Sequence, residues 1–516
     1  MKMRKAWAGV AAVAAAALVG ALGAAPSPAF AATDAASLQK EIASGAVKLE
    51  KDITASVEIP EGANVTIDLN GRTLTADSKW AAITNNGHLT VTDSVGGGKV
   101  DGADVSQNAA LYNAPTGTAT LNAGTFTGSK WYVIKNLGNM TIDGAAVIQN
   151  DAGTSGIDNG YYGNAGNDCN VAYPSSAEVN LTIKSGSFSN GMNAVKNDDF
   201  GTLVVNGGTF SNTDGPAILN WNVAEINGGQ FIAADGVESV IANGSYATTA
   251  DQGKLTINGG IFTASNGSTA NIFAQGVGGT DGGTVTVTAG NFAGSLANLD
   301  QLQIGVTVSG GTFSDENVIT RVADGHAVVK STNGFSVMSD EEASNTSLAK
   351  IVVNGTNVYF DSVDDAKAYA KEKGYSEEDV KVVNYVVTFV ANGETTDVYL
   401  VKAGEPLGEL PKIPEYEGHT VDGWYVDVTE GTDGSATGTK IDETYVPTGD
   451  TTVTAMWTEN PVTPSTPAAD TKPAAEAPKK ALPQTGDNTD VVLPAVIAGV
   501  GIVVIAAALI VRRHHN

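Results

Sequence analysis

The segment Leu203-Val-Val-Asn-Gly-Gly-Thr-Phe210 carries the pattern that decides the fold of this chain. It joins a short alternating strand to a glycine bend and ends on one large apolar residue. Further copies of the pattern end at Phe126, Val147, Phe188, Phe231, Phe262, Phe292 and Phe313. Copies that recur about every 21 residues indicate a repeat architecture. The longer interval from Val147 to Phe188 fits either two repeats or one repeat with a large insertion.

Each repeat is too short to bury its apolar face alone, so the copies must stack. Leucine-rich repeats have a similar length, but their spaced leucines and helical half are absent. The pattern predicts a parallel β-helix with about 22 residues per turn and a rise of ~4.8 Å per turn. An internal ladder is expected from Phe126, Phe188, Phe210, Phe231, Phe262, Phe292 and Phe313. Asn122, Asn206, Asn227 and Asn258 are expected to line one turn through left-handed backbone and amide hydrogen bonds.

An exposed first strand would be a site for unwanted pairing, so the β-helix needs a cap. The segment Ala35–Ser44 is expected to form that cap as a helix, with Leu38 and Ile42 on one face. Asp34 is placed to cap its N-terminus, and Gly45 is placed to stop it.

Residues 32–336 resemble the right-handed parallel β-helices of the pectin-lyase-like superfamily, particularly the glycine-rich kind found on bacterial surface proteins. Galacturonan hydrolases of that superfamily carry Asn-Thr-Asp, Asp-Asp, Gly-His-Gly and Arg-x-Lys in that order. Here Asp198-Asp199 precedes Asn212-Thr213-Asp214, and Ala327 follows Gly325-His326. We therefore assign no catalytic residue and expect these carboxylates to be turn residues. The resemblance implies a fold and says little about activity.

Calcium is the one ion that the composition leaves open, because aspartates recur along the repeats and Ca²⁺ prefers oxygen ligands. The residues concerned are Asp151, Asp158, Asp168, Asp198, Asp199 and Asp214. No EF-hand or RTX-type loop is present, so we expect solvated turn carboxylates, no metal site and no cofactor. The only cysteine, Cys169, excludes an intrachain disulfide and a cysteine-based metal site.

The longest loop, Asn150–Glu178, is the candidate ligand-binding region, because binding residues concentrate on loops. Tyr161, Tyr162 and Tyr173 lie there among glycines and asparagines, and their rings suit contact with a glycan or a protein. The alternative is a loop that merely covers one coil. The net charge of −27 disfavours nucleic acid and anionic membranes as partners.

Residues 340–384 are expected to form a small α+β module. Asn354-Gly355 predicts a hairpin within Lys350–Phe360, and Ser362 begins a helix expected over Val363–Lys373. A further strand is expected over Val380–Val383.

Residues 385–458 form a separate β-rich unit that contains Gly423-Trp424-Tyr425 and Ala455-Met456-Trp457. These segments resemble the Listeria–Bacteroides repeat, of the internalin B-repeat type, which implies a β-grasp-like module of bacterial surface proteins. The family usually has Gly-Tyr where this chain has Gly418-His419. Both tryptophans are expected to anchor the core of a small sheet.

The two ends of the chain have the composition of processing signals. Residues 1–31 combine basic residues, an apolar run and an Ala-x-Ala site, which predicts a secretory signal peptide cut after Ala31. The segment 459–481 is rich in proline and predicts an extended spacer.

Residues 482–516 contain Leu482-Pro483-Gln484-Thr485-Gly486, an apolar stretch at 491–511 long enough to span a bilayer, and a basic tail. This order resembles the LPxTG cell-wall sorting signal of Gram-positive bacteria. The resemblance implies that sortase cuts between Thr485 and Gly486 and that Thr485 becomes linked to peptidoglycan. We therefore expect a secreted, wall-anchored surface protein that is an adhesin or binding protein. A carbohydrate-active enzyme on the β-helix and a passive structural stalk are the alternatives.

Overall fold

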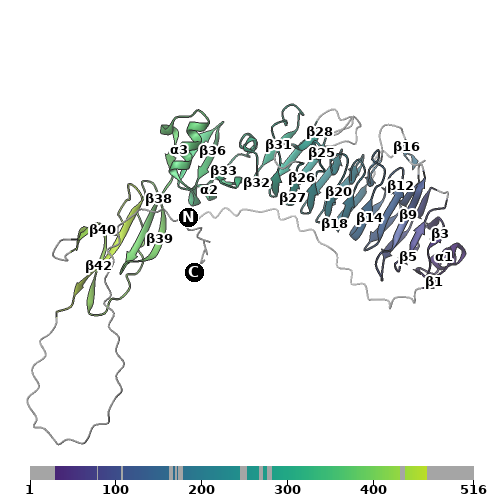
Figure 1. Ribbon diagram of the computed structural model, residues 1–516, viewed down its shortest axis with the longest axis horizontal. Coiled ribbons are helices and arrows are strands. Elements are labelled where there is room, and N and C mark those ends of the chain that lie inside the picture. The colour runs from purple at the N-terminus through teal and green to yellow at the C-terminus, as the bar shows by residue number, and fades with distance from the viewer. Residues whose placement is uncertain are drawn as a thin grey trace, which may run out of the picture. The chain divides into compact units, whose positions relative to one another are not determined.

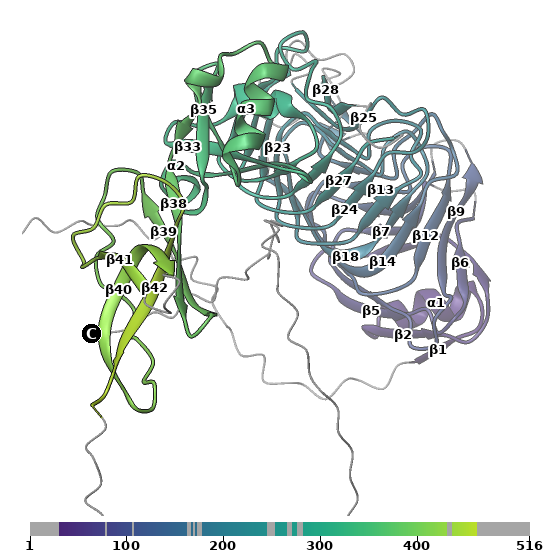
Figure 2. The same cartoon turned by 60° about the vertical axis from the view of Figure 1, so that its left-hand side comes forward.

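The computed structural model describes residues 30–77, 80–105, 108–161, 167–168, 171–172, 178–244, 253–265, 271–275, 282–430 and 436–461. From residue 30 to the last coil strand, the chain winds as a parallel β-helix (Figures 1 and 2). Each coil between Ala46 and Gln275 adds one strand to each of three ladders. The predicted fold class, mainly β with a parallel β-helix followed by smaller modules, is therefore confirmed.

The first sheet runs the length of the β-helix. Its strands are β1 (Phe30–Ala32), β2 (Ala46–Leu49), β5 (Asn64–Asp68), β8 (His88–Thr92), β11 (Thr118–Leu121), β14 (Asn139–Ile148), β18 (Val179–Ser189), β20 (Gly201–Val205), β23 (Val223–Ile226), β26 (Lys254–Ile257), β29 (Thr284–Val287) and β31 (Gly305–Val308). All neighbouring pairs are parallel and in register, as in Leu203 beside Leu181 and Ala224. Alternate residues point inward, so one face of each strand enters the common core.

The second sheet follows the glycine bend of each coil. It comprises β3 (Ile53–Thr54), β6 (Thr73–Thr75), β9 (Lys99–Val105), β12 (Thr125–Ser129), the second halves of β14 and β18, β21 (Thr209–Ser211), β24 (Gln230–Ile232), β27 (Ile261–Thr263), β30 (Asn291–Ala293) and β32 (Gly311–Phe313). The second glycine of the bend has a positive φ, +105° at Gly208 and +109° at Gly229. Glycine is required there because left-handed backbone is costly for other residues.

The third sheet closes each coil. Its strands are β4 (Val57–Ile59), β7 (Ala81–Asn85), β10 (Ala109–Asn113), β13 (Ile134–Asn136), β15 (Ile157–Asn159), β19 (Val195–Asn197), β22 (Ile218–Asn220), β25 (Ser239–Asn243) and β28 (Asn271–Gln275). Because β13, β15 and β19 are adjacent, and β14 pairs directly with β18, the long interval from Val147 to Phe188 is one coil with an insertion. Within that insertion β16 (Asn167–Asp168) and β17 (Val171–Ala172) pair antiparallel.

The predicted phenylalanine ladder is present with one exception. Rings of Phe188, Phe210, Phe231, Phe262, Phe292 and Phe313 stack nearly parallel, with centroids 4.7 to 4.9 Å apart. Phe126 has the same register and is buried, but Val147 lies between it and Phe188. The prediction that Phe126 joins the stack was therefore wrong, because one coil carries valine at this position.

The predicted asparagine row is shorter than expected. Asn227 donates to Asn206 at 3.0 Å, and Asn258 donates to Asn227 at 2.9 Å. Asn122 lies too far along the stack to join them, because Asp143 and Lys184 hold this position in the two coils between. The asparagines of this row do not have a positive φ, so the expected left-handed backbone falls on the glycines instead.

A second asparagine ladder, which the sequence analysis did not predict, lies inside the β-helix. Its members end successive strands of the third sheet and are all fully buried: Asn85, Asn113, Asn136, Asn159, Asn197, Asn220 and Asn243. Each Nδ2 except that of Asn243 donates to Oδ1 of the next member at 2.7 or 2.8 Å. The same amides also donate to backbone carbonyls, as Asn197 does to Val223 O at 2.9 Å. These bonds satisfy buried polar groups at the turn into the next coil.

The N-terminal end is covered by α1 (Ala35–Ile42), as predicted. Asp34 accepts from the backbone of Ser37, and both Leu38 and Ile42 are buried in the core of the β-helix. Preceding it, β1 pairs with β2, so the peptide bond after Ala31 lies within a paired strand.

The C-terminal end of the β-helix continues into the α+β module without a break in the sheet or the core. After η1 (Glu316–Arg321), the hairpin of β33 (His326–Ser331) and β34 (Gly334–Ser339) pairs antiparallel with β32. The remaining elements are α2 (Asp340–Thr346), β35 (Ala349–Val353), β36 (Thr356–Phe360), α3 (Val363–Glu372), η2 (Glu377–Asp379) and β37 (Lys381–Val382). The predicted hairpin, helix and last strand are all present, whereas α2 was not predicted.

The last unit is a five-stranded sheet in the order β39-β38-β42-β40-β41. Its strands are β38 (Asn384–Ala391), β39 (Glu394–Lys402), β40 (His419–Glu430), β41 (Ala436–Lys440) and β42 (Thr451–Glu459). It has its own hydrophobic core. Trp424 is buried there against Phe389, and its Nε1 donates to Pro411 O at 2.8 Å. Trp457 is only half-buried, so Trp424 is the stronger anchor.

Candidate functional site

Of the three tyrosines predicted to bind a ligand, the structure describes Tyr161. Tyr161 lies two residues after β15, where its ring packs edge-on against Phe200. The residue is 3% exposed. Its backbone N–H donates to Asp199 O at 2.9 Å, so Tyr161 is part of the wall of the coil and offers no open ring face. Tyr162, Tyr173 and Cys169 lie outside the described residues.

The predicted sorting signal, with Leu482, Pro483, Gln484, Thr485 and Gly486, also lies outside the described residues, as do the apolar segment 491–511 and most of residues 1–31. Among the helices in the described part of the chain, none has the length and apolarity needed to span a membrane.

A cluster of charged side chains lies on the outer face of the third sheet. The central residues of three adjacent strands alternate in charge: Lys135 on β13, Asp158 on β15 and Lys196 on β19. Lys135 Nζ donates to Asp158 Oδ2 and, at 2.8 Å, to Gly160 O. Lys196 Nζ lies 2.5 Å from Asp198 Oδ2 and 3.9 Å from Asp158 Oδ1. We refer to Lys135, Asp158, Lys196 and Asp198 as the buried charge network.

All four side chains of this network are shielded from solvent, with Lys196 the most exposed at 6%. Desolvation by burial raises the pKa of Asp198 to about 7. The positive charge of Lys196 lowers this pKa, and the negative charge of Asp158 raises it further. The expectation of solvated turn carboxylates was therefore wrong for Asp158, Asp198 and Asp199, which the stacked coils bury. It holds for the exposed Asp214.

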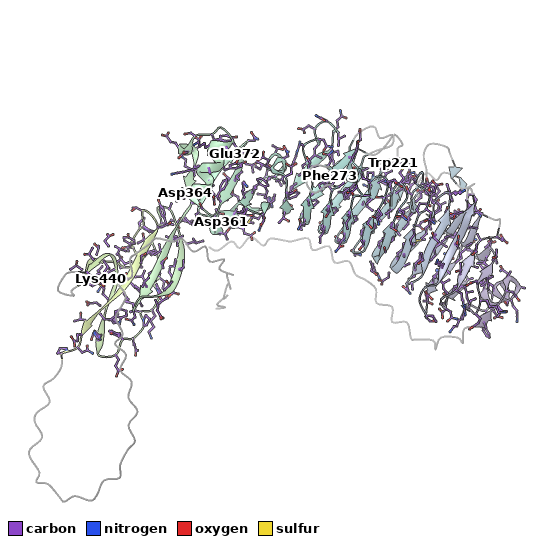
Figure 3. All side chains as sticks on the ribbon, in the orientation of Figure 1. Trp221, Phe273, Asp361, Asp364, Glu372 and Lys440 are labelled. Carbon is purple, nitrogen blue, oxygen red and sulfur yellow. The ribbon has the colours of Figure 1, made fainter. Side chains whose placement is uncertain are left out.

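Aromatic rings surround the network. Lys196 Nζ lies over the Trp221 ring at 4.5 Å, and both lysines lie within 6 Å of the Tyr132 ring centroid. Tyr132 is half-buried, and its ring contacts that of Trp131. Trp131 in turn contacts Trp80, with the ring centroids 5.2 Å apart, and both tryptophans are half-buried. Trp221 and Phe273 mark this flank of the coil stack in Figure 3.

An open groove lies on a different edge of the β-helix, along the glycine bends between the first and second sheets. Its volume is about 640 Å³. The groove is lined by Ser185, Gly186, Gly207, Gly208, Thr209, Gly228, Gly229, Gln230, Gly260 and Ile261. All of these residues are uncharged, and the glycines leave the backbone within reach of a ligand. The Asn206–Asn227–Asn258 row lies at the same bends, so amide groups are repeated once per coil beside the groove.

Sequence reasoning missed Lys135 and Lys196 because it followed only the strand that precedes the glycine bend. A second signal was available in the triplets Ile134-Lys-Asn136, Ile157-Asp-Asn159, Val195-Lys-Asn197 and Ile218-Leu-Asn220. The third residue of each joins the inner asparagine ladder, and the middle residue faces outward. Aligning these triplets predicts the Lys-Asp-Lys row directly.

The described residues contain no group of three or more His, Cys, Asp or Glu side chains placed to hold a metal ion. In the buried charge network, each carboxylate is instead paired with a lysine.

Comparison with known proteins identifies one part of the chain. The family model for the Listeria-Bacteroides repeat domain matches residues 385–456, which form the sheet of β38 to β42. No curated protein and no solved structure matches the chain. The C-terminal sheet is thus similar to a repeat typical of bacterial surface proteins.

Proposed function

We propose that the chain is the precursor of a cell-wall-anchored surface protein of a Gram-positive bacterium and that its β-helix binds ligands outside the cell. The observation that carries this proposal is the repeat-type domain at residues 385–456. It precedes a proline-rich spacer and an LPxTG-like signal, in the order that display from a cell wall requires. In this proposal sortase cleaves after Thr485 and joins that residue to peptidoglycan.

The anchoring step is tested by expressing the full chain in a sortase-positive Gram-positive host. Wild-type protein is expected in the wall fraction, released by a muramidase. Thr485→Ala is expected to move most of it to the membrane and medium, whereas Thr489→Ala, four residues away, leaves it in the wall. Wall attachment that survives Thr485→Ala, or that is unchanged in a sortase-deficient host, would contradict the proposal.

The binding surface that the geometry supports best is the glycine-lined groove. It is open, it runs along the coils, and its lining of uncharged groups with neighbouring amides suits the hydroxyl groups of a glycan or the backbone of a protein segment. A chain with a net charge of −27 favours neutral or basic ligands over acidic polymers.

Binding is tested with the full chain on a glycan array and a panel of matrix proteins. Thr209→Arg places a long side chain in the groove and is expected to weaken binding at least tenfold. Thr307→Arg, on an exposed position of β31 outside the groove, is the matched control and retains full affinity. Equal loss in both variants would place the binding surface elsewhere, and no saturable binding in either screen would favour the passive stalk.

A second candidate function is a carbohydrate-active enzyme that uses Asp158 and Asp198, two carboxylates that share the Lys196 ammonium at 3.9 and 2.5 Å. Burial raises the pKa of Asp198, and because both carboxylates are enclosed, this function requires the coil to open to a substrate. It predicts new reducing ends in the same binding wells. This product would be lost in Asp198→Asn and retained in Asp214→Asn, the exposed control. Binding without product supports the adhesin.

A further inference from the structure

The proposals on wall anchoring and on the glycine-lined groove make no use of the buried charge network. It nevertheless holds an amine and a carboxyl group against each other in a fully enclosed position, with a third and a fourth ionisable group beside them. Burial of an ion pair costs free energy even when the pair is well formed, because both ions lose their hydration. A reaction that neutralises the buried pair would remove this cost.

We propose that Lys135 and Asp158 are joined by an intramolecular amide bond between Nζ and Cγ, which forms after the β-helix has folded. Such a bond would link two successive coils covalently through their side chains. The proposal is independent of the ligand and of sortase, since it concerns only buried groups on the outer face of the third sheet.

The fold holds the two reacting groups in place. Lys135 and Asp158 are directly opposite each other in the parallel pair of β13 and β15, and Ile134–Ile157 and Asn136–Asn159 are paired on either side. The hydrogen bond that Asn136 Nδ2 donates to Asn159 Oδ1, at 2.7 Å, keeps the register fixed next to them. Condensation is then a unimolecular step between fixed partners, which is the situation in which effective concentrations become very high.

The neighbouring groups can carry the charges and protons of the reaction. Gly160 O accepts from Lys135 Nζ at 2.8 Å and orients the amine. Among the residues that the structure describes, Asp158 Oδ1 has no hydrogen-bond partner. The Lys196 ammonium, 3.9 Å away, is placed to stabilise negative charge that develops on this oxygen. Asp198, 2.5 Å from Lys196, has a pKa of about 7 and can both take up and return a proton at neutral pH.

The step is balanced without any co-reactant. Starting from the ammonium and the carboxylate, the Nζ–Cγ bond forms and the Cγ–Oδ2 bond breaks. Two protons from Lys135 Nζ pass to the departing oxygen, with Asp198 as the carrier, and one molecule of water leaves. Two buried charges become one neutral amide, so the desolvation cost of the pair is removed.

Tryptic mapping of the denatured full-length protein decides the matter. Without the bond, trypsin cleaves after Lys130, Lys135 and Lys184 and releases peptides 131–135 and 136–184. With the amide bond, trypsin does not cleave after Lys135. A single peptide, 131–184, then appears, and its mass is lower by one water than the mass calculated from its sequence. We expect this linked peptide in most of the purified wild-type protein. Complete release of 131–135 and 136–184 would overturn the proposal without recourse to any variant.

Variants test the assigned roles. Asp198→Asn removes the proton carrier and is expected to reduce the linked fraction at least tenfold, while the exposed Asp214→Asn leaves it unchanged. An undiminished linked fraction in Asp198→Asn would refute the role given to Asp198. The pair of Lys184 and Asp143, 3.8 Å apart but about half exposed, is an internal control within the same digest, and cleavage after Lys184 must remain complete.

Discussion

At the scale of single residues, the contribution of an asparagine side chain to stability depends on whether it is buried. Asn197 and Asn227 both belong to amide ladders along the coils. Asn197 is completely buried and donates to another side chain and to the carbonyls of Gly201 and Val223. Asn227 lies on the exposed row, where water can replace its partners. A hydrogen bond is costly to lose only when the groups left behind cannot reach water.

Asn197→Ala is therefore expected to lower the free energy of unfolding of the β-helix by about 3 kcal/mol, because it leaves several buried groups without partners. Urea unfolding followed by circular dichroism measures the change. Asn227→Ala is the matched control and should cost less than about 0.5 kcal/mol. Equal losses in the two variants would contradict the distinction between the inner and outer ladders.

Asp198 gives a second prediction at this scale. Its pKa is about 7 in the folded protein, above its ordinary value of 3.8, so the folded state holds this proton more tightly than the unfolded state. The stability contributed by the protonated group is fully present below about pH 4 and is lost as the pH rises through 7. The slope for one such group reaches at most about 1.4 kcal/mol per pH unit.

Thermal unfolding of wild-type protein and Asp198→Asn between pH 4 and 8 tests this sign. The stability difference, wild type minus variant, should fall as the pH increases. Asp214→Asn, on an exposed carboxylate, should follow the wild-type curve. A difference that grows with pH would mean that Asp198 is held ionised by Lys196.

At the scale of elements, the repeat is stabilised because most coils fill the bend and the core position after it with the same residue types. In the coil of β23, the strand is followed by Asn227 and a glycine pair. The second glycine, Gly229, has a positive φ, and Phe231 then turns inward onto the ring of Phe210 in the preceding coil. Each ring is thus covered by the coils before and after it. Such an array gains stability from contacts between nearest neighbours.

Phe231 lies in the middle of the stack, with Phe210 and Phe262 at 4.7 and 4.9 Å. Phe231→Ala should cost about 3 to 5 kcal/mol, since the closed coils cannot collapse around the cavity. Urea unfolding again gives the value. Ile232→Ala, at the next position but pointing outward with 39% of its surface exposed, should cost under about 1 kcal/mol. A small loss at Phe231 would show that neighbouring coils can close the gap.

At the scale of the whole molecule, the two largest hydrophobic cores of the described residues separate the repeat-type sheet from the rest. One core runs from Ala32 through the β-helix and into the α+β module, where it includes Phe360 and Tyr369. The repeat-type sheet has the second core, around Phe389, Trp424 and Val453. Loss of the second core should therefore leave the β-helix folded.

Trp424→Ala tests this independence. Hydrogen exchange followed by mass spectrometry should show lost protection in residues 385–459 and unchanged protection in the third sheet of the β-helix. Trp457→Ala, at a half-buried site in the same sheet, should have a smaller effect. Loss of protection across the β-helix in Trp424→Ala would mean that the two cores unfold together.

The repeat, the glycine bends, the capping helix and the type of the C-terminal module could all be predicted from the amino-acid sequence. These features depend on residues that are close together in the sequence. Examples are the alternation along a strand, the helix cap Asp34 and the turn Asn354-Gly355. The predicted processing signals at the two ends are also local patterns, and they remain predictions.

Which polar residues are buried, and which of them contact one another, follows from the stacking of the coils and could not be predicted. Lys135 and Asp158 are 23 residues apart and Lys135 and Asp198 are 63 apart, yet successive coils bring them to one place. The same stacking encloses Asp198, which the sequence presented as an ordinary turn residue, and leaves Asp214 exposed. It also separates Phe126 from the ring stack by one valine. The residues that contact each other between coils depend on how one coil aligns with the next. This alignment changes with the number of residues inserted in each turn, so a short stretch of sequence does not determine it.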